Sequence, residues 1–270
     1  MKEETNRKYL YRYMHYTEFS DMIRLKRLTL KYPGKWEDNL ELLFLKCFEN
    51  KGRLEKLLDE YRKKSLPNTA EHDIKSDFQI ISSWLLGIRC QCWTHKEDDL
   101  IMWNARNSTE TIRICVNREV FDRCKEDTDK EDTDKEDTDM VLVHRDVDYQ
   151  PEISIESIVE AFFKNDRRIH PLIFTKKDVF SYEEEYRIAI IPPFSFCANS
   201  YGNTLSEFLQ NHFYEVKAEN GVANKYLRFN INNIEDVKVH PNASESFASL
   251  IEADCESYGI KYRGKSKILD

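Results

Sequence analysis

The chain has 270 residues, of which 40% are hydrophobic and 33% charged, with a formal net charge of -8. This length can bury a full hydrophobic core, and the acidic balance excludes a general electrostatic attraction to nucleic acid. No apolar run approaches the ~20 residues of a membrane helix, and the polar start at residues 1–5 is not a signal peptide. We therefore expect one α+β domain over residues 1–270, cytoplasmic and without membrane contact.

Strand and helix patterns follow one another irregularly, which favours the α+β class over a doubly wound sheet. Alternating or aromatic residues predict strands at 9–14, 88–94, 111–116, 140–144, 226–229 and 237–240, and a last one after Gly259. The alternation at 88–94 indicates a half-buried strand. Helical spacing predicts helices at 19–28 (capped by Thr17), 40–48, 54–61, 78–86, 100–103, 155–163, 205–213 and 244–257.

One internal repeat, Lys-Glu-Asp-Thr-Asp, occurs three times from Lys125 to Asp139. It contains no apolar residue, so burial cannot offset the entropy lost on folding, and a disordered acidic surface insertion is predicted at 125–139. Its aspartate spacing suggests calcium, but the glycine and closing glutamate of a calcium loop are missing. A solvated charge run is the favoured interpretation.

The seven cysteines are scattered, and Cys90 and Cys92 are the only close pair. The chain has no second pair at zinc-site spacing, no paired-histidine motif and no glycine-rich phosphate loop. Buried thiols are therefore expected rather than disulfides or a metal site.

An acidic stretch, Phe180–Arg187, leads into the apolar run 188–191, which two prolines end. An extended backbone there would put Glu183 and Glu185 on one face. Two such carboxylates repel each other unless a cation or ligand hydroxyls lie between them, and one would have a raised pKa. The alternative is a solvated strand edge on which Arg187 pairs locally.

Several separated residues fit one nucleotide site. A guanidinium matches phosphate oxygens with its planar fork of donors, and it keeps its charge. Aromatic rings can hold a nicotinamide or adenine ring, and a carboxylate can bond a ribose hydroxyl and stabilise an oxocarbenium ion. Together they predict an NAD-consuming glycosyl-transfer site with NAD-binding residues Arg12, Tyr13, Trp93, Thr94, Trp103 and Tyr182 and catalytic residues Glu183 and Glu185.

Four sequence blocks occur in order: Leu10-Tyr11-Arg12-Tyr13, Trp36–Glu41, Cys92-Trp93-Thr94 with Met102-Trp103, and Phe180–Arg187. Together they resemble an uncharacterised prokaryotic family, a domain of unknown function often found near defence genes. The match spans most of the chain, but the family usually has Asn-Asp-Pro where this chain has Asp38-Asn39-Leu40.

The layout is also similar to the ADP-ribosyltransferase fold, whose Arg or His, Ser or Tyr, and Glu lie on three separated strands. Arg12–Phe19 parallels the His-x-Thr start of the DNA-modifying transferase toxins, which implies that Arg12 holds NAD. Trp93-Thr94 and Trp103 resemble the middle motif that supports nicotinamide. Glu183–Glu185 resembles the Glu-x-Glu signature, which implies that Glu185 is catalytic and that Glu183 orients or deprotonates the acceptor.

The resemblance implies a mono-ADP-ribosyltransferase that uses NAD as a substrate and modifies a protein or nucleic acid. Such a protein would be a toxin or antiphage defence effector, with an antitoxin as a candidate partner. The rival function is a non-catalytic regulatory protein that binds a nucleotide or an RNA end in the same cleft. The transferase hypothesis requires Arg12 and Glu185 to meet across one nucleotide-sized groove.

Each predicted site residue also has a purely structural interpretation. Arg12 could pair with an acid across the sheet, and Thr94 could be an ordinary strand residue. The two tryptophans, Trp93 and Trp103, could belong to the core. The histidines at positions 15 and 95 are interpreted as surface residues.

Overall fold

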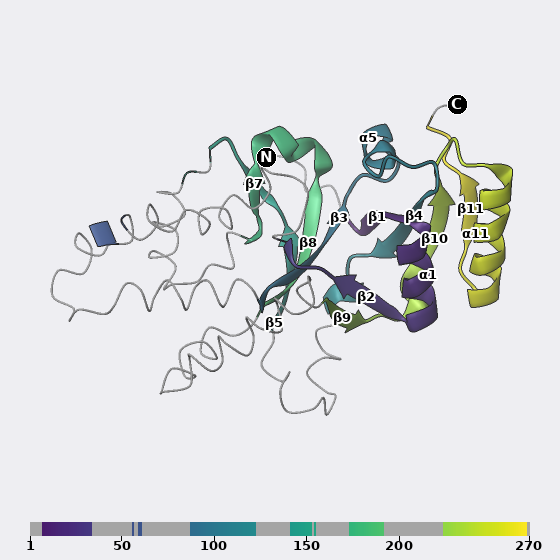
Figure 1. Ribbon diagram of the computed structural model, residues 1–270, viewed down its shortest axis with the longest axis horizontal. Helices are drawn as coiled ribbons and strands as arrows, with labels where there is room; N and C mark the ends of the chain where they lie inside the picture. Colours follow the sequence, from purple (N-terminus) through teal and green to yellow (C-terminus); the bar gives the residue numbers. More distant parts are fainter. Residues whose placement is uncertain are drawn as a thin grey trace, which may run out of the picture.

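The centre of the molecule is a seven-stranded sheet in the order β11-β10-β4-β1-β3-β8-β5 (Figure 1). The computed structural model describes residues 7–33, 56, 59–60, 87–122, 141–152, 154, 173–191 and 224–268. Neighbouring strands are antiparallel except β10 and β11, which are parallel. The strands are β1 (Tyr9–His15), β3 (Arg89–Thr94), β4 (Thr111–Asn117), β5 (Val141–Asp146), β8 (Glu185–Ile191), β10 (Ile234–Val239) and β11 (Tyr262–Lys265).

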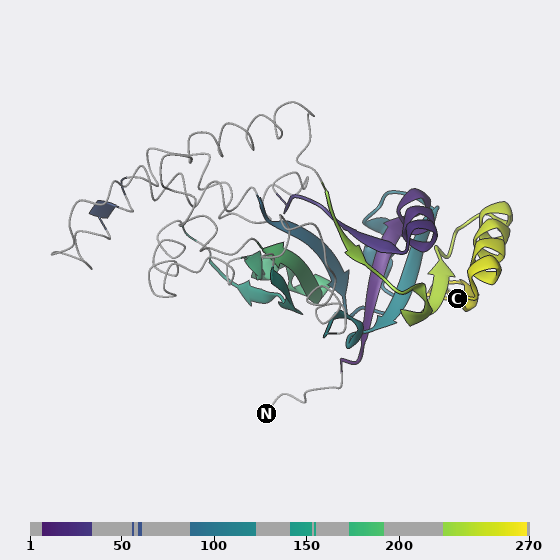
Figure 2. The ribbon, with the colours of Figure 1, turned by 90° about the horizontal axis from the view of Figure 1, so that it is seen from below.

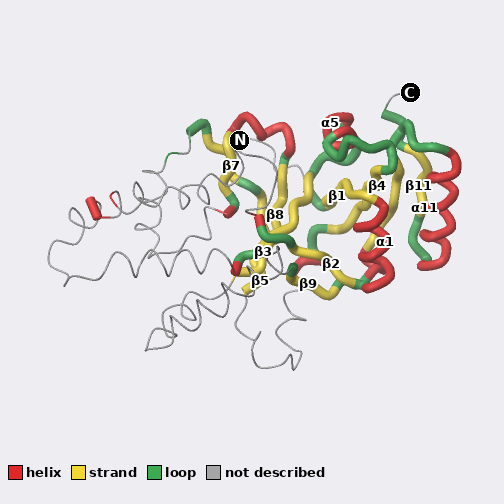
Figure 3. Tube along the Cα trace, in the orientation of Figure 1, coloured by secondary structure: helices red, strands yellow, loops and turns green. Residues whose placement is uncertain are grey.

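Two small sheets and a few helices accompany the large sheet (Figure 3). One small sheet is an antiparallel ribbon of β2 (Arg27–Leu30) and β9 (Lys225–Arg228), and the other pairs β6 (Asp148–Gln150) with β7 (Thr175–Lys177). The helices with bounds inside the described residues include α1 (Tyr16–Leu25), α5 (Leu100–Asn104), α11 (Glu245–Tyr258) and the 3-10 turns η2 (Asp178–Glu183) and η3 (Ile231–Asn233). Both ribbon views place α11 at the β11 edge of the sheet (Figure 2).

The large sheet has two different faces, and successive side chains of β1 point alternately to one face and the other. Leu10 and Met14 point toward α1, where they pack in the main core with Phe19. Tyr11 and Tyr13 point the other way, and Tyr13 packs edge-on against Trp103 of α5 at 4.9 Å between ring centroids. We call these the α1 face and the α5 face.

Most expected elements in the described part of the chain are present, and the α+β class is confirmed. Strands occur at all six predicted stretches and after Gly259, whose φ of 68° allows the turn that ends α11. Ser244 caps α11 by accepting from the Phe247 amide. The strand at 89–94 is buried on both faces rather than half-buried, since further elements cover each face.

Two local predictions are wrong. Thr17 does not cap α1, because β1 runs directly into the helix and His15 occupies the cap position without a side-chain bond. The helix also ends at Leu25 rather than Leu28. Lys26 there takes a left-handed conformation with φ of 51°, and the next residues pair with β9 instead. Strand pairing with a distant segment overrides the local helical spacing.

Several predictions lie outside the described residues. They are the acidic insertion at 125–139 and the helices expected at 40–48, 78–86, 155–163 and 205–213, with nearly all of the one at 54–61.

Candidate functional site

Arg12 and Glu185, the two residues on which the predicted reaction depends, lie on opposite faces of the sheet. Tyr11 pairs directly with Thr94, and Thr94 pairs with Glu185. Directly paired residues of antiparallel strands point to the same face, so Glu185 shares the α5 face with Tyr11. Arg12, the next residue of β1, points to the α1 face.

The strand β3 itself separates the two side chains. Arg12 Nη1 donates to the carbonyl oxygen of Cys92 at 2.8 Å. The Cys92 thiol, in contrast, hydrogen-bonds Glu185 on the α5 face. The register of the sheet therefore contradicts a single groove that joins the Arg12 guanidinium to the Glu185 carboxylate.

Glu185 is sealed in an ion cluster. Its side chain is 3% exposed and contacts Arg187 at 2.7 Å and Lys176 Nζ at 3.5 Å. Arg187 is itself fully buried and donates to the Ile173 carbonyl. Burial raises the pKa of Glu185, but the two cations outweigh it and lower the pKa to about 2. A carboxylate enclosed in this way stabilises the fold and cannot reach a substrate.

Lys176 is the cation between the two neighbouring carboxylates Glu183 and Glu185. Its Nζ atom contacts Glu183 at 2.7 Å as well as Glu185. The backbone is not extended here, because η2 ends at Glu183 and Glu184 has a left-handed φ of 43° before β8 begins. Burial raises the pKa of Glu183, with Lys176 opposing the rise.

The aromatic residues predicted to hold NAD are mostly core residues. Trp103 is fully buried and donates from Nε1 to Asp98 Oδ1 at 2.7 Å. The Tyr13 hydroxyl donates to the Glu97 carbonyl at 2.9 Å. Trp93 is buried on the α1 face and donates to Gln91. These contacts leave none of the three rings as an open wall for a cofactor.

The remaining predicted residues lie near the η2 turn. Thr94 Oγ1 donates to the Glu183 carbonyl at 2.5 Å, which ties β3 to the turn. Tyr182 is 43% exposed on η2. His95 is expected at the surface, but its side chain is only 4% exposed because it packs against Tyr186 on the α1 face. The His95 ring also contacts Asp146 at 2.5 Å.

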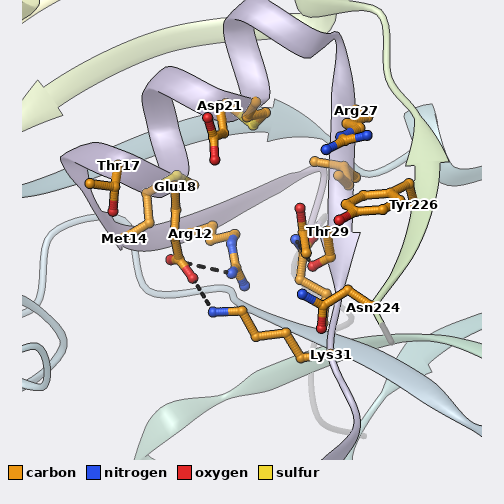
Figure 4. A pocket seen from close by; sticks show the side chains of 13 residues that line it. Arg12, Met14, Thr17, Glu18, Asp21, Arg27, Thr29, Lys31, Asn224 and Tyr226 are labelled. Atoms are coloured by element: carbon orange, nitrogen blue, oxygen red, sulfur yellow. Dashed lines mark hydrogen bonds and ion pairs between the residues drawn. The ribbon is translucent and has the colours of Figure 1, made fainter. Parts of the chain in front are cut away.

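Arg12 lines a pocket of about 220 Å³ between α1 and the β2–β9 ribbon (Figure 4). Its guanidinium is nearly buried, with 10% of the side chain exposed. Charged and polar side chains from α1, the ribbon and β3 surround it, with only a few apolar ones. The lining residues include Glu18, Arg27, Thr29, Lys31, Asn224 and Tyr226.

Glu18 lies between two cations in this pocket. Lys31 Nζ donates to Glu18 Oε1 at 2.5 Å, and Arg12 Nη2 is 3.7 Å from Oε2 (Figure 4). Burial raises the pKa of Glu18, but Arg12 and Lys31 together lower it to about 2. Its Oε2 atom is buried and has no hydrogen-bond partner among the residues that the structure describes. An unpaired acceptor therefore faces a guanidinium that is too far away to bond it.

A cation–π pair forms another side of the pocket. The Arg27 guanidinium carbon lies 3.6 Å from the centroid of the Tyr226 ring. Thr29 pairs with Tyr226 across the ribbon, so both point to the same face. Tyr226 is 49% exposed, which leaves part of its ring open.

The acid beside Arg12 was missed from the sequence. Glu18 follows Arg12 by six residues, across a change from strand to helix, so no simple periodicity relates them. The position of Glu18 in the first turn of α1 was the available signal, because an acid there is favoured by the helix dipole. Lys176 was missed as well, although two close carboxylates require a cation.

Comparison with known proteins finds no matching family model, no matching curated protein and no matching solved structure. In the part of the chain that the structure describes, no helix is both long and apolar enough to cross a membrane.

Proposed function

We propose that the Arg12 pocket binds a phosphorylated ribonucleoside. The observation that carries this proposal is the unpaired Glu18 Oε2 opposite Arg12 Nη2, 3.7 Å apart within one pocket. When the Glu18 side chain turns its Oε2 toward the pocket, a ligand hydroxyl can donate to this oxygen while its own oxygen accepts from the Arg12 guanidinium, and both groups are satisfied. The vicinal hydroxyls of a ribose are such a group.

The other lining residues suit the rest of a nucleotide. Arg27 and Lys31 are cations that can pair with phosphate oxygens. The exposed part of the Tyr226 ring can stack on a base. Asn224 and Thr29 add polar groups that can fix orientation. A bare anion fits less well, because Glu18 would repel it.

The size of the pocket limits how much of a ligand it encloses. Its volume of about 220 Å³ is below the roughly 300–1,000 Å³ typical of pockets for whole small molecules. The pocket can hold one nucleoside unit, so a dinucleotide such as NAD would extend beyond it along the ribbon.

ADP-ribosyl transfer from NAD to a macromolecular acceptor is a second candidate. The residues that the resemblance assigns to the triad, Arg12, Thr94 and Glu185, lie on three different strands, β1, β3 and β8. Because Glu185 is sealed on the other face, we assign the acid of this candidate to Glu18. Its ionised carboxylate beside Arg12 would stabilise the ribosyl oxocarbenium ion.

The binding proposal is tested by isothermal titration with AMP, ADP-ribose, NAD and ribose 5-phosphate. Arg12→Lys keeps the charge but loses the planar fork. It should weaken AMP binding by about 10- to 100-fold, equivalent to one or two hydrogen bonds to a charged group. The matched control is Arg24→Lys, which changes an exposed α1 residue outside the pocket lining. No binding of any of these ligands, or equal weakening by both variants, contradicts the proposal.

The transferase candidate is tested by release of nicotinamide from NAD. Glu18→Gln should abolish the release, whereas Glu183→Gln should leave it within about twofold, since Glu183 lies on the other side of the sheet. Loss of release in Glu183→Gln alone would return the catalytic role to the acidic stretch. Binding of NAD without release by the wild type refutes transfer and leaves the binding proposal standing.

A further inference from the structure

The two strands of the ribbon beside the pocket concentrate positive charge in an acidic protein. The chain has a formal net charge of -8. No acidic residue occurs from 22 to 33 or from 220 to 234, so both segments of the ribbon lack carboxylates altogether. In the described residues of these two segments the cations are Arg24, Lys26, Arg27, Lys31, Lys225 and Arg228. Arg24 and Lys31 pair with Asp21 and Glu18 of α1, and the other four belong to the ribbon and its α1 end.

Pairing across the ribbon places cations and an aromatic ring on one face. Arg27 pairs with Arg228, and Thr29 pairs with Tyr226. Directly paired residues share a face and residues two apart in a strand share it too, so all four lie on the same side. The other side carries Leu28 and Leu227, which are buried in the main core. The outward face of the ribbon is therefore the cationic and aromatic one.

This face continues outward from the pocket. Arg27, Thr29 and Tyr226 line the pocket, whereas Arg228 does not. Arg228 is exposed, and it lies two residues beyond Tyr226 along β9, opposite Arg27. A nucleic acid whose terminal nucleotide occupied the pocket would bring its neighbouring nucleotides to Arg228.

We propose that this ribbon binds single-stranded nucleic acid whose terminal nucleotide occupies the Arg12 pocket. The proposal rests on the proposed function and names its ligand class. Cations that follow the backbone together with an aromatic ring for base stacking are the two elements of single-strand binding. A duplex fits less well, because the pocket admits one nucleoside unit and not a base pair.

The test measures fluorescence anisotropy of a labelled mixed-sequence 12-mer, as RNA and as DNA, beside titration with AMP. The 12-mer should bind at least about tenfold more tightly than AMP, by the usual worth of one stacked base or phosphate contact. Arg228→Gln should weaken the 12-mer about three- to tenfold, reduce the salt dependence by about 0.7 in slope, and leave AMP unchanged. Lys267→Gln, an exposed cation near the C-terminus, is the charge-matched control and should change neither.

Each outcome decides a different proposal. A 12-mer that binds no more tightly than AMP, or equal weakening by the two variants, overturns the nucleic-acid inference while AMP binding keeps the pocket. A 12-mer that binds through Arg228 while AMP does not bind at all refutes the proposed function and supports the ribbon alone. A 12-mer that binds only as a duplex also overturns the inference.

Discussion

Two carboxylates in this protein have the same electrostatic surroundings but different access to solvent. Glu18 lies between Arg12 and Lys31, whose side chain is 50% exposed. Glu185 lies between Arg187 and Lys176, neither of which is more than 3% exposed. Both carboxyl groups have a pKa of about 2. The difference shows that a lowered carboxyl pKa does not identify a binding site unless the group can also be reached.

The largest expected contrast is in stability. Glu185→Gln should lower the free energy of unfolding by about 3–5 kcal/mol, because it leaves Arg187 buried without its counter-charge. Glu18→Gln should cost less, about 1–2 kcal/mol, because Lys31 can turn to water, although the nearly buried Arg12 also loses its counter-charge. Urea unfolding of both variants measures the contrast. Equal losses would show that the two clusters do not differ as described.

Acidification should destabilise the protein through both carboxylates. A folded-state pKa below the ordinary value of 4.5 gives stability that is present above pH 4.5 and lost as the pH falls toward 2. The raised pKa of Glu183 acts in the opposite direction. A tenfold change in an acid dissociation constant corresponds to about 1.4 kcal/mol, so Glu18→Gln should reduce the loss between pH 5 and 2.5. Urea titrations at four pH values test this, and identical slopes for wild type and variant would contradict it.

A smaller effect tests whether the α5 face is structural. Trp103→Phe removes the hydrogen bond to Asp98, which should cost about 1 kcal/mol of unfolding free energy. AMP or NAD binding should not change. Weaker ligand binding at unchanged stability would instead give this tryptophan the role of a cofactor wall.

The smallest expected effect concerns the exposed neighbour of Glu185. Glu184 contacts Arg7 and Lys96 at 3.6 Å, with more than a third of its side chain exposed. Glu184→Gln should therefore change the unfolding free energy by at most about 1 kcal/mol. It is the matched control for Glu185→Gln, and a comparable loss in both would place the cause in the turn rather than in burial.

The strands could be predicted because their patterns are local. Aromatic and alternating residues at 9–14 and 111–116 fix two central strands of the sheet, and β8 begins where the acidic stretch ends. Whether Arg12 shares a face with Glu185 is not a local property. It depends on the pairing of Tyr11 with Thr94, and a slip by one residue would reverse it.

The acidic stretch shows a second limit. Three successive glutamates before an apolar run are typical of a strand end, and β8 is a strand. The left-handed Glu184 and the 3-10 turn before it are set by the Ser181 carbonyl, which accepts from the Glu184 amide, and by contacts of Glu183 with Lys176. Those contacts come from a strand that the sequence did not reveal.

The way Arg12 is held has a consequence for how the protein tolerates change. Its anchor on β3 is a main-chain oxygen, and every amino acid at position 92 supplies the same atom. The thiol at that position serves the opposite side. Substitutions of Cys92 can therefore remodel the sealed interior without moving the guanidinium, so the two sides of the sheet are free to diverge separately.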